Sequence, residues 1–273
     1  MTRARRAGLV RGLALLLPLG LLSCRGGPAA PADPCRVFLC DHNAIVRGDT
    51  SVRRMSLVFT GGSFADGGDH IREVLRKEKV KAGFFFTGDF YRTPEFAGLI
   101  RGLASDGHYL GAHSDRHLLY CDWDDRQKTL VTREDFRSDL LANYREMERF
   151  GIGRDKARLF IPPFEWYNRD IAQWSRELGL VLFNFTPGTS SNADYTTPSM
   201  PEYKSSREIY DRILAYEAKD PNGLNGFILL IHIGTDPERT DKFYLMLGDL
   251  IADLRASGYA LVRIDELLRQ PAR

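Results

Sequence analysis

Two histidines, His113 and His117, lie four residues apart in the stretch Gly-Ala-His-Ser-Asp-Arg-His. Side chains with this spacing share one face of a helix or helical turn, so both imidazoles lean toward the same point. The arrangement suits a shared metal ion, because neutral imidazole is a common zinc ligand. A surface pair without function is the alternative interpretation of this short stretch.

Other residues capable of chemistry stand just after predicted strands. In a parallel barrel the carboxyl ends of all strands open on one face, and that face holds the active site. His113, His117 and His232 are three of the six histidines, and all three follow or end apolar runs. These positions predict one functional site on one rim. Further polar residues at equivalent places are Asp66, Asp89, Glu165, Asn192 and Asp194.

A site of this composition favours hydrolysis. A metal held by two imidazoles and one carboxylate keeps positions open for water and for a substrate carbonyl. It lowers the pKa of the water and polarises the carbonyl. A carboxylate would act as the base, and His232 would protonate the leaving group. The alternative for His232 is a structural histidine that ends a buried strand.

The elements that must position these residues alternate along the chain. Continuous apolar runs indicate strands buried on both faces, as in a parallel sheet covered by helices. No glycine-rich dinucleotide loop follows the first strand, so a barrel is favoured over an open doubly wound sheet. The predicted strands are 55–60, 82–87, 108–112, 159–161, 180–185, 226–231 and 259–264. The predicted helices are 69–79, 93–105, 134–150, 168–178, about 206–218, 241–257 and a short terminal helix.

The composition is that of a globular protein and argues against nucleic-acid binding. The chain has 273 residues, 43% of them hydrophobic and 27% charged, which is enough for a large core. Its formal net charge is +2, but the first 23 residues hold four arginines and no acid, which leaves 34 basic and 36 acidic residues in the rest. A near-neutral body without a basic stripe argues against a nucleic-acid partner.

The N-terminus is typical of an export signal. An arginine-rich start precedes an apolar run, residues 13–22, that is too short to span a membrane. The sequence Leu-Leu-Ser-Cys ending at Cys24 resembles a bacterial lipobox, which implies lipidation of Cys24. The alternative is an ordinary secretory signal with an incidental cysteine. We expect a lipid-anchored protein of the bacterial cell envelope, with a signal peptide at 1–23, a tether and N-terminal segment at 24–50, and a catalytic barrel at 51–273.

Two local features are expected in an exported protein of this kind. Cys35 and Cys40 are predicted to form a disulfide that closes a small loop, which leaves Cys121 free. Thr132, three residues before Asp135, is predicted to cap the helix that follows.

Five segments stand out along the chain, at 56–60, 80–88, 113–117, 160–164 and 229–232. In order and spacing they resemble motifs of the polysaccharide deacetylases of the NodB-homology group, over about residues 54–268. The resemblance implies a deformed (β/α) barrel that removes acetyl groups from N- or O-acetylated sugars with zinc or a similar divalent ion. It also implies that His113 and His117 are metal ligands and that His232 is the general acid. The segments are 56–60 (T-F-D-D in the family), 80–88 (V-K-A-T-F-F-x-x-G), 113–117 (the His-Ser/Thr…His metal motif), 160–164 (F-R-P-P-Y) and 229–232 (L-x-x-H).

The chain departs from the family pattern at its carboxylates. Thr60 and Gly61 stand where the family has its base and its third metal ligand, and Ile161 stands where it has an arginine. An arginine without its carboxylate partner would be a poorly compensated charge. The absence of the arginine is therefore consistent with the absence of the carboxylates.

Other carboxylates are therefore expected to supply the missing functions. Asp66 is the first choice for the third metal ligand and for a catalytic role, with Asp115 as a contender and helix capping as the alternative for Asp66. Glu165 is the candidate base, because the apolar rings of Phe164 and Trp166 beside it would raise its pKa. A surface carboxylate is its alternative. Substrate contacts are expected from Pro163, Trp166, Tyr167, Asn184 and Thr186.

Two further functions stay open at this point. A catalytically inactive barrel could bind glycan through Trp166, Tyr167, Phe164 and Tyr195, as the missing carboxylates suggest. A metal-dependent amidase that acts on a non-sugar substrate is the other alternative.

Overall fold

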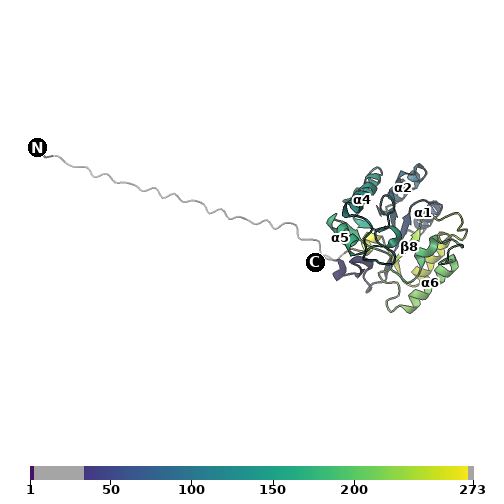
Figure 1. The fold of residues 1–273 in the computed structure, drawn as a ribbon. Helices are drawn as coiled ribbons and strands as arrows, with labels where there is room; N and C mark the ends of the chain where they lie inside the picture. Colours follow the sequence, from purple (N-terminus) through teal and green to yellow (C-terminus); the bar gives the residue numbers. More distant parts are fainter. Residues whose placement is uncertain (3–33, 270–273) are drawn as a thin grey trace. The chain divides into compact units, whose positions relative to one another are not determined.

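The computed structural model describes residues 1–2 and 34–269 (Figure 1). The chain separates into two units, Met1–Asp33 and the part from Pro34 onward. Cys24 and residues 3–23 of the expected signal peptide lie outside the described residues, so the assignment of the signal peptide and of Cys24 stays a prediction. Within the part that is described, no helix is long and apolar enough to cross a membrane.

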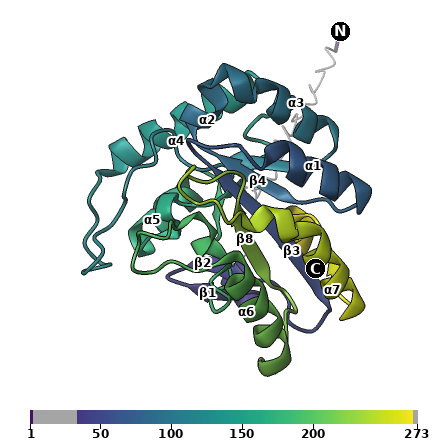
Figure 2. The same ribbon diagram turned by 90° about the vertical axis from the view of Figure 1, so that its right-hand side faces the viewer.

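A curled parallel sheet forms the centre of the second unit (Figure 2). Its strand order is β7-β6-β5-β4-β3-β8, with β9 beside the start of β3. All seven strands coincide with predicted apolar runs, so the expected α/β barrel of about seven parallel strands is confirmed. The strands are β3 (Arg54–Gly61), β4 (Gly83–Phe86), β5 (Tyr109–Ala112), β6 (Leu159–Phe160), β7 (Val181–Leu182), β8 (Ile228–His232) and β9 (Ala260–Leu261).

Helices cover the outside of the sheet. The predicted cap is confirmed, because Thr132 and Asp135 form a capping box at the start of α4. The short helices α2 and η4 were not expected from periodicity, since neither reaches two helical turns. The α-helices are α1 (Gly68–Lys77), α2 (Gly88–Arg92), α3 (Ala97–Ser105), α4 (Arg133–Glu148), α5 (Arg169–Glu177), α6 (Ser206–Lys219), α7 (Leu247–Ala256) and α8 (Ile264–Leu267). The 3-10 helices are η1 (Pro34–Arg36), η2 (Pro94–Phe96), η3 (Pro163–Glu165), η4 (Ser191–Tyr195) and η5 (Phe243–Met246).

The core explains the continuous apolar runs. Leu57 and Phe59 of β3 pack in one hydrophobic cluster, while Val58 between them packs in a second cluster on the other face. Successive side chains of a strand point to opposite faces, so both faces of β3 are buried.

An antiparallel hairpin lies where the barrel would otherwise open. It consists of β1 (Leu39–Asp41) and β2 (Ala44–Arg47). Ile45 bridges Phe183 next to β7, and the Gly48 N–H donates to the Gly226 carbonyl just before β8, at 2.7 Å. The segment that was expected to lie outside the barrel therefore contributes to its closure. The predicted disulfide joins Cys35 to Cys40 in β1 of this hairpin, and Cys121 is free, as predicted, and is buried.

Arg47 fastens this hairpin to the loop before β8, which yields a stability prediction. Its side chain is 4% exposed overall and donates to the carbonyls of Gly223 at 2.7 Å and Asn225 at 2.8 Å. Arg47→Ala should lower the free energy of unfolding by about 2–4 kcal/mol, because one buried and one partly buried carbonyl lose their donors. Thermal denaturation would measure this loss, and exposed Arg36→Ala is the control. Equal melting temperatures for the two variants would contradict the role of Arg47.

Candidate active site

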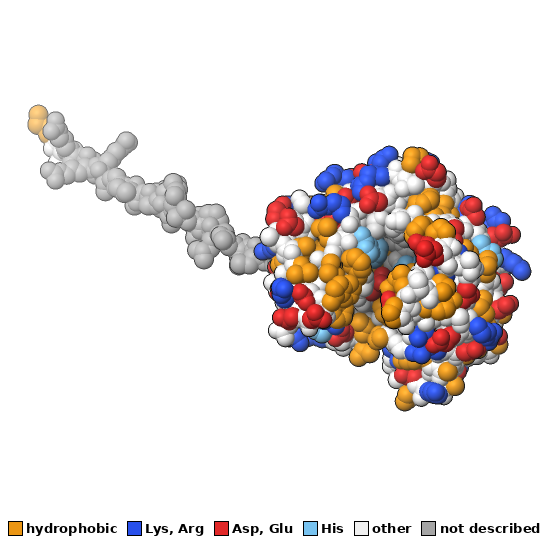
Figure 3. Space-filling view, turned by 45° about the vertical axis from the view of Figure 1, so that its right-hand side comes forward, with side chains coloured by type: hydrophobic (Ala, Val, Ile, Leu, Met, Phe, Trp, Pro, Cys, Tyr) orange, Lys and Arg blue, Asp and Glu red, His pale blue; other side chains and the backbone are white. Residues whose placement is uncertain are grey.

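A cavity of about 790 Å³ opens at the carboxyl ends of β3, β4, β5 and β8. Figure 3 shows the hollow with a histidine at its edge and hydrophobic side chains on both sides of it. The cavity therefore lies at the rim that the sequence analysis predicted, where the carboxyl ends of these strands meet. The lining residues are Thr60, Gly61, Gly62, Ser63, Phe64, Thr87, Asp89, His113, His117, Trp123, Phe164, Glu165, Asn192, Tyr195, Met200, His232, Gly234, Thr235 and Asp236.

His113 and His117 lie together, but not on a helix. They lie in irregular chain after β5, and His117 itself has a positive φ of 54°. Their ring centroids are nevertheless 5.0 Å apart. The expectation of a helical turn was wrong, because helix α4 holds the loop instead. Asn143 accepts the His113 N–H at 2.9 Å, and Asp139 accepts both the Ser114 hydroxyl at 2.5 Å and the Asp115 N–H at 3.1 Å.

Both imidazoles are neutral at physiological pH. Burial lowers the pKa of His113 well below its ordinary value, and burial lowers the pKa of His117 to about 4. The Nδ1 atom of His113 lies 3.0 Å from the Ile161 carbonyl oxygen, which can only accept a hydrogen bond. Nδ1 therefore carries the proton, and Nε2 keeps its lone pair.

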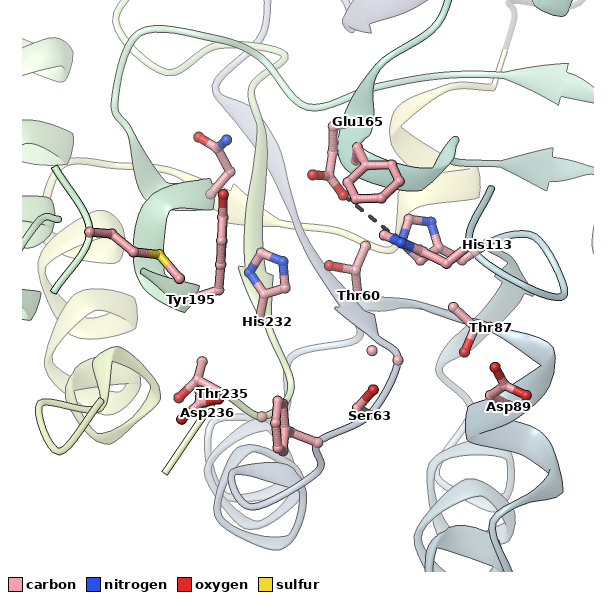
Figure 4. Close-up of a pocket in the computed structure, with 18 of the residues that line it drawn as sticks. Thr60, Ser63, Thr87, Asp89, His113, Glu165, Tyr195, His232, Thr235 and Asp236 are labelled. Carbon is pink, nitrogen blue, oxygen red and sulfur yellow. Dashed lines mark ion pairs between the residues drawn. The ribbon is translucent and has the colours of Figure 1, made fainter. Parts of the chain in front are cut away.

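Glu165 enters the cavity through an unusual turn after β6. Phe164 and Glu165 both have left-handed backbone conformations, with φ of 57° and 52°. The amide of Asn184 donates to the Glu165 carbonyl at 2.7 Å and supports this turn. Glu165 Oε1 lies 4.0 Å from His113 Nε2 (dashed line in Figure 4). Burial raises the pKa of Glu165 to about 7.

His232 is paired with Asp194, a buried residue of η4. His232 Nδ1 lies 2.6 Å from Asp194 Oδ1, and the His232 backbone N–H donates to Oδ2 at 2.9 Å. Burial lowers the pKa of His232, but the Asp194 charge and hydrogen bond outweigh it, so the net pKa is raised. Figure 4 shows His232 on the wall opposite Glu165 and His113, with Thr60 between them.

Asp194 is a residue of the candidate site to which the sequence analysis assigned no role. The only available signal was its place in a polar loop after the fifth strand. Its contact with His232 spans 38 residues of sequence, and η4 carries no hydrophobic periodicity from which its direction would follow.

Asp66 does not reach the cavity, which corrects its assignment to the metal and to catalysis. Its carboxylate accepts the Thr235 N–H at 2.8 Å and the Tyr244 hydroxyl at 2.7 Å, and it pairs with Lys242 at 3.0 Å. Asp66 therefore ties the loop after β3 to the segment after β8. It is not a helix cap either, since Gly67 is the N-cap of α1 and has no side-chain cap. The other contender, Asp115, pairs with Arg92 at 2.7 Å.

The residues at the family's first-motif positions, Thr60 and Gly61, are tightly enclosed in this structure. Thr60 is 1% exposed, and its hydroxyl has no hydrogen-bond partner. At Gly61 an added Cβ would lie 2.7 Å from Ile233 Cγ2 and 3.0 Å from ring atoms of Phe86 and Phe90. A carboxylate at position 61 would require these side chains to move.

The five expected substrate contacts are also corrected, because none of them lines the cavity. Pro163 and Tyr167 are buried. Thr186 donates to the Val46 carbonyl at 2.6 Å, and Asn184 supports the Glu165 turn. Trp166 lies one layer behind the cavity, against Trp123. Strand ends predict a rim, but the direction of each side chain there depends on local turns.

The sequence analysis predicted a divalent metal at this site, but the candidate ligand side chains do not converge on one point. Among residues 34–269 no group of three histidine, cysteine or carboxylate side chains is placed to hold a metal ion. Two neutral imidazoles have the right chemistry, but Glu165 approaches only one of them, at 4.0 Å. The residues present thus do not fit a three-ligand centre, and we derive no step through a metal.

Solved structures of other proteins share this fold. A carbohydrate esterase family 4 pseudoenzyme from Bacillus anthracis aligns with a TM-score of 0.65 and 19% identity, over 84% of this chain and 70% of that one. The chitin deacetylase of Colletotrichum lindemuthianum aligns with a TM-score of 0.65 and 20% identity, over 84% and 92%. At these identities the likeness establishes the fold.

The chain belongs to the polysaccharide deacetylase family, whose model matches residues 47–183. A curated relative is the peptidoglycan-N-acetylglucosamine deacetylase PgdA of Listeria monocytogenes, 24% identical over 79% of this chain. The chain spans only 39% of the length of that relative.

Proposed function

We propose that this protein removes acetyl groups from an acetylated glycan of the cell envelope. The observation that supports it is the His232–Asp194 pair facing Glu165 across one cavity. One wall holds a carboxyl with a pKa of about 7, and the other holds an imidazole with a raised pKa. Two groups tuned in this way suit base and acid roles near neutral pH.

In the proposed reaction, ionised Glu165 takes a proton from a water molecule as its oxygen bonds to the acetyl carbon. Protonated His232 then donates to the sugar nitrogen or oxygen while its bond to that carbon breaks. Acetate and the deacetylated sugar leave, Glu165 releases its extra proton to solvent, and His232 takes up a proton from solvent. Asp194 holds His232 through Nδ1, which directs Nε2 to the cavity.

The relatives support a sugar substrate. Besides the Listeria relative, the peptidoglycan-N-acetylmuramic acid deacetylase PdaA of Bacillus subtilis is 22% identical over 83% of this chain and 76% of its own length. We test the proposal by incubating the protein with N-acetylated and O-acetylated oligosaccharides and measuring released acetate. Turnover that His232→Ala removes supports it, and no acetate from any acetylated glycan overturns it.

A second candidate function is glycan binding without turnover. It is favoured by one observation, the packing of Ile233, Phe86 and Phe90 around Gly61, which occupies the space of the family's third metal ligand. Glycan binding that is unaffected by His232→Ala, with no acetate released, would establish this alternative.

Zinc binding yields a separate prediction. We expect zinc to bind with a free energy smaller in magnitude than the roughly 10 kcal/mol of the weakest structural zinc sites. The reason is that the imidazoles of His113 and His117 lie 5.0 Å apart, and no group of three ligands is placed to hold a metal among the described residues. Calorimetric titration of chelator-treated protein should show a weak site that His113→Ala removes. Replacing His42, which lies on the β1–β2 hairpin outside the cavity, is the control. Stoichiometric zinc retained through purification would contradict the expectation.

The proposed location follows from the N-terminus. Export, cleavage before Cys24 and lipidation of that residue would place the barrel at a membrane of the cell envelope, near its glycans. Mass spectrometry of the mature N-terminus tests this, and Cys24→Ser should release the protein from membranes. Retention of that variant on membranes would contradict a lipid anchor.

A further inference from the structure

Trp123 is an exposed aromatic ring at the mouth of the cavity. It is 55% exposed, although the hydrophobic effect favours burial of so large a side chain. It lies in the loop between β5 and α4 and lines the cavity with Phe164, against which it packs edge-on at 5.7 Å. Phe164 is itself 43% exposed, so the two rings form an exposed apolar patch beside the cavity, and such patches commonly mark binding surfaces.

The ring is held in place from behind. Trp166 stacks on Trp123 with ring centroids 5.7 Å apart and planes 25° apart, and its Nε1 donates to the Asp122 carbonyl at 3.0 Å. The Arg126 guanidinium lies over Trp166, 4.4 Å from the ring centroid, and pairs with Asp41 at 2.9 Å. This layered support fixes the ring before any ligand arrives, which reduces the entropic cost of binding.

The loop itself is internally braced. Asp122 Oδ1 accepts the Asp124 N–H at 2.9 Å and the Asp125 N–H at 3.1 Å, and Cys121 bridges Thr129 across the loop. Trp123 therefore sits at the turn of a fixed hairpin, where it cannot easily fold into the core.

The charges of the cavity limit what is bound there. Its lining includes the carboxyl residues Asp89, Glu165 and Asp236, whereas none of its lining residues is lysine or arginine. A sugar with a carboxylate would meet like charges, and His232 is the one lining residue with a raised pKa that could carry a compensating positive charge. An uncharged acetylated sugar meets no such penalty.

We propose that Trp123 is the stacking platform for a second sugar of an uncharged glycan chain whose acetylated sugar occupies the cavity. The apolar C–H face of a pyranose suits an exposed indole face. This proposal rests on the proposed function only for the identity of the sugar chain. It implies a preference for chains over single sugars and for neutral chains over acidic ones.

Calorimetry with glycans tests the proposal without requiring turnover. Glu165→Gln protein is titrated with the pentasaccharide of N-acetylglucosamine and with the single sugar. Adding Trp123→Ala should weaken pentasaccharide binding about tenfold and leave binding of the single sugar within about twofold. Leu130→Ala, at a residue of the same loop that is 45% exposed and outside the cavity lining, is the matched control and should change neither.

A second titration tests the charge argument. An oligosaccharide of similar length that alternates N-acetylglucosamine with glucuronic acid should bind at least about tenfold more weakly. Equal affinity for the two chains, or equal loss with Trp123→Ala and Leu130→Ala, would overturn the proposal. Because binding is measured directly, the effect of Trp123→Ala on glycan binding does not depend on turnover. Absence of acetate release would therefore refute the proposed reaction but not the role of Trp123.

Discussion

Replacing Glu165 by glutamine is expected to lower the rate of acetate release by about 100-fold or more. Glutamine keeps the shape of the side chain but cannot take a proton from water, and a positioned base contributes about 10²–10⁴ to the rate. The rate should be measured as acetate formed from an N-acetylated oligosaccharide at pH 7.5. Exposed Glu95→Gln, outside the cavity, is the control for the same chemical change.

The expected loss of activity in Glu165→Gln must be distinguished from a loss of folded protein. Burial raises the pKa of Glu165 to about 7, so the folded protein loses stability as pH rises through the range from 4.5 to 7 and this carboxyl ionises. Glutamine does not ionise, so the variant should unfold at the same or a higher temperature at pH 8 in chelator-treated protein. Full activity of Glu165→Gln would exclude this residue as the base.

Replacing Asp194 by asparagine is expected to move the alkaline limb of the pH–rate profile to lower pH. His232 must be protonated to act as the acid, and the Asp194 charge raises its pKa against the opposing effect of burial. Asparagine removes that charge, so His232 loses its proton at lower pH. The rate at pH 8 should fall by about 10–100-fold, with a smaller loss at pH 6.

A complete profile of rate against pH for both proteins measures this shift. Asp211→Asn, on the exposed part of α6, is the control and should leave the profile unchanged. An equal loss at every pH would indicate that Asp194 acts only by holding the loop. An unchanged rate at every pH would remove the His232–Asp194 pair from the acid role.

The site departs from the family pattern in the position of its carboxylate. Gly61 is enclosed by Ile233, Phe86 and Phe90, so the loss of that carboxylate is built into the packing of the core. Glu165 brings a carboxylate from the β6 side of the same cavity, within 4.0 Å of His113. The two variants above decide whether this arrangement still supports turnover.

The sequence by itself determined the order of the strands along the chain, and hence the class of fold. Runs such as 55–60 and 226–231 are apolar on both faces, and only a covered parallel sheet buries such runs. The histidines His113, His117 and His232 were placed on one rim by the same reasoning, because parallel strands end on one face. The disulfide and the Thr132 cap depend on residues close in sequence, so they were also predictable.

Only the tertiary structure decided which carboxylates face those histidines. Asp66 is bound by residues after β8, and Asp194 reaches His232 across 38 residues, so neither outcome is encoded in a local pattern. Glu165 turns inward because two successive residues adopt positive φ, a conformation that side-chain type rarely signals. The sequence thus specified the elements and their polar ends through local periodicity, whereas contacts between distant loops selected the residues that form the site.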